Sequence, residues 1–328
     1  MRMFAGRHTI MLCMCLCVPI IAAAQTRIPA GVKEVQTRIS SLPKAATIHL
    51  GGDPDWMAIG EDAVWISNEK RKSVFRIDPK TDRIVARVRF KDPPCSGLAI
   101  GFGSLWVPIC AKQPSLVRVD LKTSKVSGML PVGPGDDEGS ITAGGGSVWI
   151  VNKEGELLRI DPERNAVAQK IALPAGSHNP LFADGLVWVT GNETNLLTPL
   201  DAATGTVLPS IAVGPKPRFL TSGAGSIWTL NQEDGSITRV SIEKRIVEAT
   251  IQAGIPGHGG EIAFGAGSVW ATLLGIPLTR IDAASNRVVH QWVGNGGDSA
   301  RFGFDSIWLT DLRAGKLWRI AVRDVSTP

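Results

Sequence analysis

The chain has 328 residues, of which 44% are hydrophobic and 20% are charged, and its formal net charge at pH 7 is +5. This balance excludes general disorder, which requires few apolar residues and many like charges. The small net charge gives no reason to expect a polyanionic partner, so we expect no nucleic-acid binding. Tyrosine is absent, and ten tryptophans and nine phenylalanines supply the aromatic side chains.

The first 24 residues have the organisation of a secretory signal peptide. Arg2 and Arg7 form a basic start, residues 9–21 form an apolar run too short for a membrane span, and three alanines follow at 22–24. We therefore expect cleavage before Gln25 and a periplasmic or secreted mature chain with no membrane span. Residues 25–44 are then expected to form an extension lying over the rim of the folded domain.

Seven tryptophans mark a repeat that fills the rest of the chain. Successive members are 41, 43, 39, 40, 42 and 38 residues apart, a period that suits four short strands and their turns. The seven anchors are Trp65, Trp106, Trp149, Trp188, Trp228, Trp270 and Trp308. The repeat predicts an all-β fold over residues 45–328, a seven-bladed β-propeller of four-stranded antiparallel blades.

A glycine-serine motif precedes several anchors. It reads Gly-Phe-Gly-Ser-Leu-Trp at 101–106, Gly-Ala-Gly-Ser-Ile-Trp at 223–228 and Gly-Ala-Gly-Ser-Val-Trp at 265–270. Glycine adopts the positive φ that a tight hairpin needs, so the motif is expected to join strands a and b, counted outward from the channel. Aspartates such as Asp78 and Asp161, each followed by proline, predict the turn from strand c to strand d.

The last repeat has too few residues for its own fourth strand. Only eight residues follow strand c at 317–320, whereas residues 46–50 precede the first anchor where other repeats have strand d. We therefore expect the strand at 46–50 to complete the last blade and close the ring, which removes the exposed edges of an open array. A closed ring of this kind is expected to be a monomer.

Two cysteines, Cys95 and Cys110, remain after the predicted cleavage. Pairing Ile100 with Leu105 across the turn of blade two makes opposed residue numbers sum to 205, and the two cysteines have that sum. They are therefore expected directly opposite each other, joined by a disulfide in an oxidising compartment. Two buried free thiols are the alternative.

Candidate binding residues follow from the repeat register. By fold-level analogy, ligands bind propellers at the channel mouth, which the loops from d to a and from b to c surround. Ten residues before the anchors, where strand a begins, stand Asp55, Ser96, Gly139, His178, Arg218, Gly260 and Asp298. Their variation predicts a ligand site that includes Asp55, Ser96, His178, Arg218 and Asp298, with solvated loop variation as the alternative.

Two further polar residue types recur, and both favour structural interpretations. Asn68, Asn152, Asn231 and Asp311 follow the anchors by three residues, and such side chains bond turn backbone. Arginine recurs on strand c at Arg76, Arg118, Arg159, Arg239, Arg280 and Arg319. Aspartate at the adjacent turn makes exposed ion pairing the expected explanation.

His258 and Glu261 form the sharpest local set for chemistry, since a histidine and a carboxylate can share a metal or act as base and orienting group. With His178, they are the candidate catalytic residues, and Asp55 or Asp298 could add metal ligands for magnesium or calcium. A loop histidine without chemistry is the alternative. The acidic run at 136–138 could hold calcium, although its spacing matches no defined calcium loop and a solvated turn explains it too.

With these motifs, the chain resembles the bacterial YVTN/YncE-like propellers and the related virginiamycin B lyase-like propellers over residues 46–321. The resemblance implies the propeller fold and, in the lyases, magnesium-assisted elimination by mouth histidines and glutamates. Only His178 is a histidine in the ring that begins strand a. His258 and Glu261 are nearby but do not match the lyase pattern.

The sequence therefore favours an exported binding or scaffold protein that recognises a small molecule, a peptide or an envelope protein at the channel mouth. A structural role in envelope assembly through the rim is a weaker possibility. The alternative is a metal-assisted lyase or hydrolase; if the chain is an enzyme, a lyase is expected. The residues do not identify the ligand or the biological process.

Overall fold

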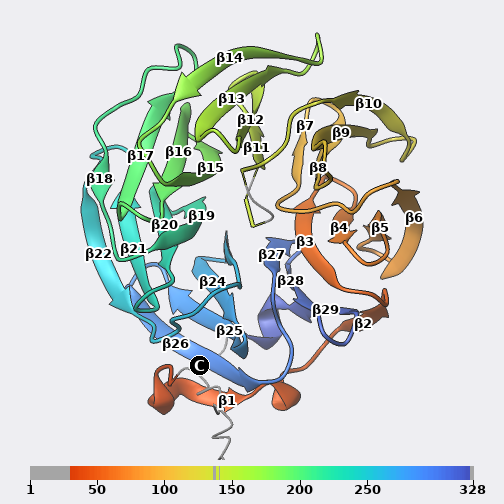
Figure 1. Cartoon of the computed structure of the whole chain (residues 1–328). Helices are drawn as coiled ribbons and strands as arrows, with labels where there is room; N and C mark the ends of the chain where they lie inside the picture. Colours follow the sequence, from red (N-terminus) through yellow and green to blue (C-terminus); the bar gives the residue numbers. More distant parts are fainter. Residues whose placement is uncertain (1–29, 136–137, 140, 326–328) are drawn as a thin grey trace, which may run out of the picture.

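The computed structural model describes residues 30–135, 138–139 and 141–325. Seven antiparallel sheets stand in a ring around a central axis (Figure 1), which confirms the predicted seven-bladed propeller. The predicted signal peptide at 1–24 and the acidic residues 136–137 lie outside the described residues. Within the described ranges, no helix is long and apolar enough to cross a membrane.

Each blade has an inner strand a and an outer strand d. Blades one to three comprise β3 (Pro54–Ile59), β4 (Val64–Asn68), β5 (Ser73–Asp78) and β6 (Arg83–Arg89); β7 (Ala99–Gly101), β8 (Ser104–Ile109), β9 (Ser115–Asp120) and β10 (Val126–Leu130); and β11 (Ile141–Gly144), β12 (Ser147–Val151), β13 (Glu156–Asp161) and β14 (Ala166–Ala172). Blades four and five comprise β15 (Ser177–Ala183), β16 (Leu186–Gly191), β17 (Leu196–Asp201) and β18 (Ile211–Ala212); and β19 (Pro217–Gly223), β20 (Ser226–Asn231), β21 (Ser236–Ser241) and β22 (Val247–Gln252).

The last two blades include strands from the N-terminal part of the chain. Blade six comprises β23 (Ile262–Gly265), β24 (Ser268–Leu273), β25 (Gly275–Asp282), β26 (Arg287–Gly294) and the added strand β1 (Gln36–Arg38); blade seven comprises β27 (Ala300–Gly303), β28 (Ser306–Asp311), β29 (Lys316–Ala321) and β2 (Ala46–His49). Short 3-10 turns flank these strands as η1 (Lys33–Val35), η2 (Ile39–Ser41) and η3 (Val322–Asp324).

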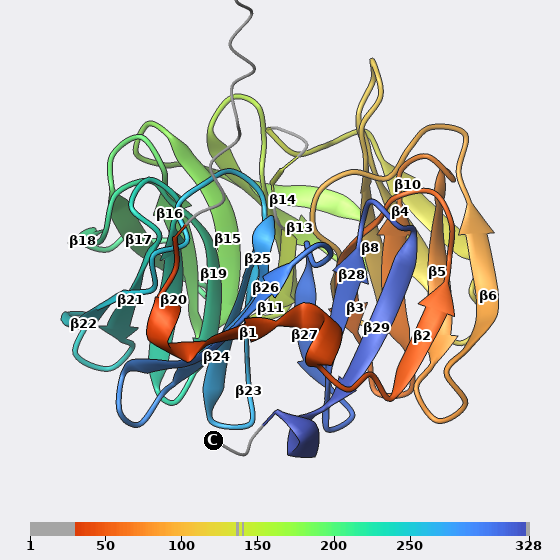
Figure 2. The same ribbon diagram turned by 90° about the horizontal axis from the view of Figure 1, so that it is seen from below.

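The N-terminal strand β2 closes the ring as predicted. It pairs antiparallel with β29, with Ala46 opposite Arg319 and His49 opposite Lys316. Before it, β1 pairs in parallel with the outer strand β26 (Figure 2). The described part of the N-terminal extension thus runs along the outer edge of blade six, where it adds a fifth strand.

The seven anchor tryptophans form the centre of each blade's packing. All seven are at most 1% exposed. In blades two to seven the preceding turns have positive φ at both central positions, as at Phe102 (56°) and Gly103 (69°), the geometry of a type I′ hairpin. The first glycine of the motif is required for a different reason, which is space. A Cβ on Gly223 would overlap the Phe264 ring of the next blade, and a Cβ on Gly265 would overlap the Phe302 ring. Glycine therefore lets adjacent blades approach.

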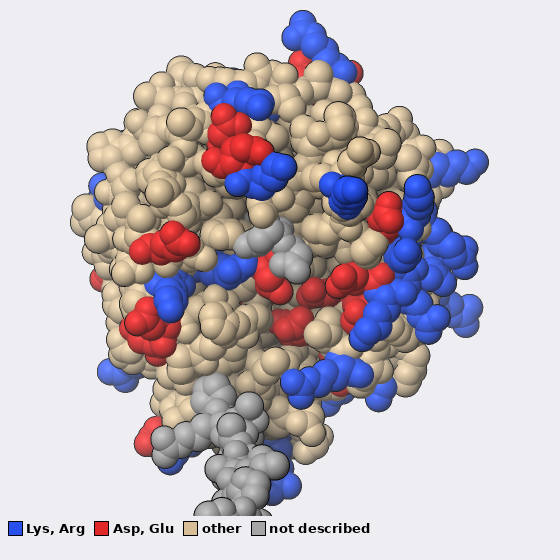
Figure 3. Space-filling view, viewed as in Figure 1, with Lys and Arg blue, Asp and Glu red and all other residues tan. Residues whose placement is uncertain are grey.

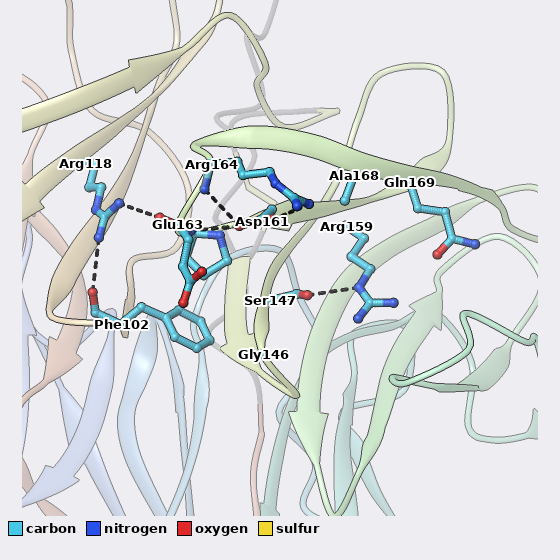
Figure 4. Close-up of a pocket in the computed structure, with 11 residues that line it drawn as sticks. Phe102, Arg118, Gly146, Ser147, Arg159, Asp161, Glu163, Arg164, Ala168 and Gln169 are labelled. Atoms are coloured by element: carbon cyan, nitrogen blue, oxygen red, sulfur yellow. Dashed lines mark hydrogen bonds and ion pairs between the residues drawn. The ribbon is translucent and has the colours of Figure 1, made fainter.

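The strand c arginines tie each blade to the next. Arg159 donates from Nε to Ser147 Oγ at 3.0 Å (Figure 4). It also lies over the Trp149 ring, 5.5 Å from its centroid, and donates from Nη1 to the Ala203 carbonyl of blade four at 3.0 Å. The same three contacts recur for Arg118, Arg239, Arg280 and Arg319. Exposed ion pairing, the predicted explanation, is therefore wrong as a general account of these arginines.

Two blades depart from this pattern. In blade one, Ala63 stands where blades two, three, five, six and seven have serine, and Arg76 instead donates to Asp62 of its own blade at 2.6 Å. In blade four, Pro199 lies opposite Trp188 in place of arginine, and the buried Trp188 Nε1 has no hydrogen-bond partner among the described residues. The junctions that follow blades one and four therefore lack this arginine tie.

Replacing Arg159 by methionine should cost about 1–3 kcal/mol of unfolding free energy, because the Ala203 carbonyl and the Ser147 hydroxyl lose a charged donor. Urea denaturation monitored by tryptophan fluorescence measures the change. Arg164→Met is the matched control, because Arg164 lies in the same blade with its side chain 84% exposed. Equal unfolding midpoints for the two variants would show that the tie contributes nothing.

Cys95 and Cys110 are joined by a disulfide, with their Cα atoms 5.5 Å apart. The predicted register is wrong, however, because the two cysteines are not directly opposite each other. Pro94 pairs with Ile109 instead. These numbers sum to 203, whereas Ile100 and Leu105 sum to 205. Ser96, with φ of 58°, interrupts the strand between the two segments, so the cysteines bridge the strands diagonally.

Candidate functional site

The channel mouth lies on the face formed by the loops from d to a and from b to c. This face is turned toward the viewer in Figure 1, and its space-filling view shows acidic side chains gathered near the centre (Figure 3). Three of the predicted residues contribute to this centre, namely Asp55, Asp298 and Glu261. They come from blades one, seven and six, which are neighbours in the closed ring.

Asp55 and Asp298 form a hydrogen-bonded carboxyl pair. Desolvation raises the pKa of Asp55 well above its usual range, and the negative charges of Asp298, Glu261 and Glu138 add to the rise. Desolvation also raises the pKa of Asp298, although the Asp55 hydrogen bond, the Gly260 backbone N–H and the charge of Arg313 oppose it. Ser299 Oγ donates to Asp55 Oδ1 at 3.0 Å. The pair therefore retains a proton to higher pH than isolated carboxyls do.

Beside this pair, Glu261 is 2% exposed and forms a two-pronged ion pair with Arg301. Arg301 Nη2 donates to Glu261 Oε1 at 2.9 Å, and Nη1 donates to Oε2. Burial raises the pKa of Glu261 to about 7, and the charge of Arg301 opposes this rise. Both carboxylate oxygens are thus engaged by a guanidinium from the next blade.

Aromatic side chains close the channel beneath these charges. Trp56 of blade one and Phe219 of blade five meet with ring centroids 5.7 Å apart at an angle of 59°. Both rings are buried, and with Glu261 and Arg301 they line a remaining cavity of about 30 Å³. The space that remains between these side chains is therefore about the volume of one water molecule.

The other predicted ring positions serve partly as tethers between blades. The Arg218 carbonyl accepts from Thr190 Oγ1 at 2.7 Å and from Asn179 Nδ2 at 3.0 Å, both in blade four. The Gly139 carbonyl accepts from Gly97 N at 2.9 Å, and the Asp298 carbonyl accepts from Thr272 Oγ1. Ser96 and Gly260 are buried, and His178 and Arg218 are half-buried.

His258 and Glu261 do not share an environment, since His258 is exposed whereas Glu261 is buried against Arg301. Among the residues that the structure describes, no three His, Cys, Asp or Glu side chains are grouped to hold a metal ion.

The residues that follow the anchors by three stabilise the turn from strand b to strand c. Asn152 Oδ1 accepts from the backbone N–H of Glu154 at 3.1 Å and of Glu156 at 2.8 Å. Asn68 Oδ1 accepts from Arg71 N at 3.0 Å, and Asp311 Oδ1 from Ala314 N at 3.1 Å. These contacts support the structural interpretation of the repeated asparagines.

Trp56, Phe219 and Arg301 are not among the residues predicted from the sequence. The first two stand nine residues before their anchors, one place beyond the predicted ring, in the position that Glu261 also occupies. Arg301 stands seven residues before Trp308, where the other blades have Ala58, Ala99, Thr142, Leu181, Thr221 and Ala263. A charged residue at a position otherwise occupied by uncharged residues was the available signal.

Two roomier cavities lie on the opposite face, at the turns from a to b and from c to d. One, of about 860 Å³, lies between blades two and three beside Phe102 and Arg164 (Figure 4). The other, of about 870 Å³, lies between blades one and two beside Asp62 and Lys122. Neither contains a residue of the predicted mouth.

Comparison with known proteins supports the fold. A solved streptogramin B lyase superposes with a TM-score of 0.69 at 18% sequence identity, covering 84% of this chain and 96% of the lyase. BamB from Moraxella catarrhalis superposes with a TM-score of 0.61 at 14% identity, covering 82% of this chain and 83% of BamB. The expected resemblance to lyase-like propellers is therefore confirmed for the fold. No protein-family model and no curated protein matches the chain.

Proposed function

We propose that the chain is an exported binding propeller whose mouth captures a positively charged group of a peptide, a protein or a small molecule. The observation that carries the proposal is the carboxyl pair of Asp55 and Asp298, whose pKa values are raised by desolvation. A guanidinium or ammonium group of a ligand supplies a further positive charge to the two carboxyl groups, and charge-assisted hydrogen bonds to it are strong.

The surroundings of the pair suit binding. The Trp56–Phe219 contact and the Glu261–Arg301 ion pair make a fixed floor, so the carboxyls are held in place before a ligand arrives. A preorganised site loses less conformational entropy on binding. Export through the signal peptide predicted at 1–24 belongs to this proposal and places the mouth outside the cytoplasm.

A metal-assisted lyase or hydrolase built on His178, His258 and Glu261 has weaker support. A metal at Glu261 would have to displace the Arg301 guanidinium from both carboxylate oxygens. Thermal unfolding of the mature protein with magnesium, with calcium and with a chelator tests this alternative. A metal-dependent rise in melting temperature that Glu261→Gln abolishes would favour the enzyme.

Binding of arginine methyl ester, measured by isothermal titration calorimetry, tests the proposed function. The Asp55→Asn/Asp298→Asn variant should bind at least about tenfold more weakly, because both carboxylates become neutral amides. Asp305→Asn is the matched control, since Asp305 lies in the hairpin turn on the opposite face, where its φ of 51° also suits asparagine. Equal affinity of the double variant and the wild type would contradict a cation site at the mouth.

A further inference from the structure

The outer strand of blade one carries a concentration of positive charge. Lys70, Arg71 and Lys72 come from the loop after β4, Arg87 and Arg89 from β6, and Lys91 from the loop after β6; we call these six residues the basic cluster. All but Arg87 are exposed. Basic side chains gather on this side of the mouth face in Figure 3.

Contacts within the basic cluster hold these like charges together. Arg87 donates from Nε to Ser73 Oγ at 3.1 Å and from Nη2 to the Arg71 carbonyl at 2.9 Å, and Lys72 Nζ donates to the Lys91 carbonyl at 3.1 Å. Desolvation lowers the pKa of Arg87, and the charges of Arg89 and Arg71 lower it further. Among the described ion pairs, the cluster's only acidic partner is Asp53, 3.6 Å from Lys70 Nζ. The cluster therefore has uncompensated charge.

The same strand has an open backbone edge. β6 is the last strand of its sheet, with no strand beyond it among the described residues. Phe90 N donates inward to the Lys72 carbonyl at 2.8 Å. Because inward and outward groups alternate along an antiparallel strand, the backbone groups of Arg89 and Arg87 face outward. At the other end of β6, Ile84 is 42% and Val85 is 53% exposed.

In blade six, the outer strand already pairs with an added strand. There β1 lies parallel to the outer strand β26, with Gln36 opposite Gln291 and Arg38 opposite Val293. An outer propeller strand can thus take an added strand without disturbing its blade. β6 has the same position in blade one. Its end near the mouth is basic, and at its other end the exposed Ile84 and Val85 follow Arg83.

We propose that β6 is a second binding surface, separate from the mouth, which accepts an acidic extended segment of another polypeptide as a fifth strand. Backbone hydrogen bonds to the outward groups of Arg87 and Arg89 provide the pairing. Acidic side chains of the segment face the basic cluster, and apolar side chains cover Ile84 and Val85. Charged side chains on an edge strand can also prevent its pairing with other chains. The experiments below therefore distinguish a binding surface from an edge that is protected against pairing.

The probe is a fluorescent peptide in which glutamate alternates with valine, and fluorescence anisotropy measures its binding to the mature protein. We expect saturable binding that weakens as salt is raised, because opposite charges are screened. Methylation of alternate peptide nitrogens should weaken binding at least about tenfold, since it removes backbone donors while it keeps the charge. If the methylated peptide or a glutamate-only peptide bound as tightly as the alternating peptide, the surface would bind anions in general. That result would overturn the proposal.

Two substitutions at one position separate charge from backbone pairing. Arg89→Gln removes one charge and should weaken binding by about threefold. Arg89→Pro also removes an outward N–H, which an edge strand tolerates, and should weaken binding well beyond Arg89→Gln. Ala172→Pro on β14, the outer strand of blade three, is the control, because Ala172 lies opposite Glu156 as Arg89 lies opposite Ser73. It should leave binding unchanged. Equal effects of Arg89→Gln and Arg89→Pro, with both variants folded by circular dichroism, would exclude strand addition.

Discussion

Replacing Arg301 by methionine is expected to lower the free energy of unfolding by about 3–5 kcal/mol above about pH 8, because it leaves the Glu261 carboxylate buried without its partner. Urea denaturation across a pH series measures this loss. The size reflects burial, since Glu261 is 2% exposed and cannot be rehydrated without opening the mouth.

The loss should depend on pH in a defined direction. Burial raises the pKa of Glu261 from its usual value of 4.5 to about 7, so the folded protein holds this proton more tightly than the unfolded chain does. The stabilisation from this proton is complete below about pH 4.5 and is lost as pH rises through about 7. Without Arg301 the pKa rises further, so the variant should approach the wild type near about pH 5, where Glu261 is neutral.

Glu261→Gln provides the control for this effect. In the Arg301→Met background it removes the ionisable group and should restore much of the stability lost at high pH, because an amide carries no charge to desolvate. A loss in Arg301→Met that is the same at both ends of the pH series would show that packing, and not the charge of Glu261, is responsible.

Replacing both Cys95 and Cys110 by alanine is expected to cost about 3 kcal/mol, the loop-closure value for a bridge that spans 15 residues. The variant should unfold at a lower urea concentration than the oxidised wild type, and the reduced wild type should match the variant. An unchanged midpoint in both would mean that the segment before β7 keeps its place through backbone bonds alone, such as that from Cys95 N to the Pro108 carbonyl.

The architecture could be predicted because its determinants are local. Each turn motif and anchor tryptophan lies within one repeat, and the short last repeat left only the strand near residue 46 to close the ring. The cysteine register failed for a local reason that carries no sequence signature: Ser96 adopts a positive φ, which serine rarely does, and shifts the ladder by two residues.

The contacts between blades could not be predicted in this way. The carbonyl that Arg159 reaches lies 44 residues further along the chain, and the sequence alone does not reveal that strand c faces the next blade's outer turn. The contact between Trp56 and Phe219 depends likewise on bringing blades one and five across the ring. Ring closure, rather than the repeat itself, creates the floor of the mouth.

Proton release on ligand binding tests the proposed cation site at Asp55 and Asp298. If a cation replaces the proton held by Asp55 and Asp298, calorimetric titration of arginine methyl ester from about pH 5 to about pH 8 should give heats that vary with the ionisation enthalpy of the buffer. We expect net proton release by the wild type and its loss in Asp55→Asn/Asp298→Asn. Binding that releases no proton at any pH in this range would contradict it.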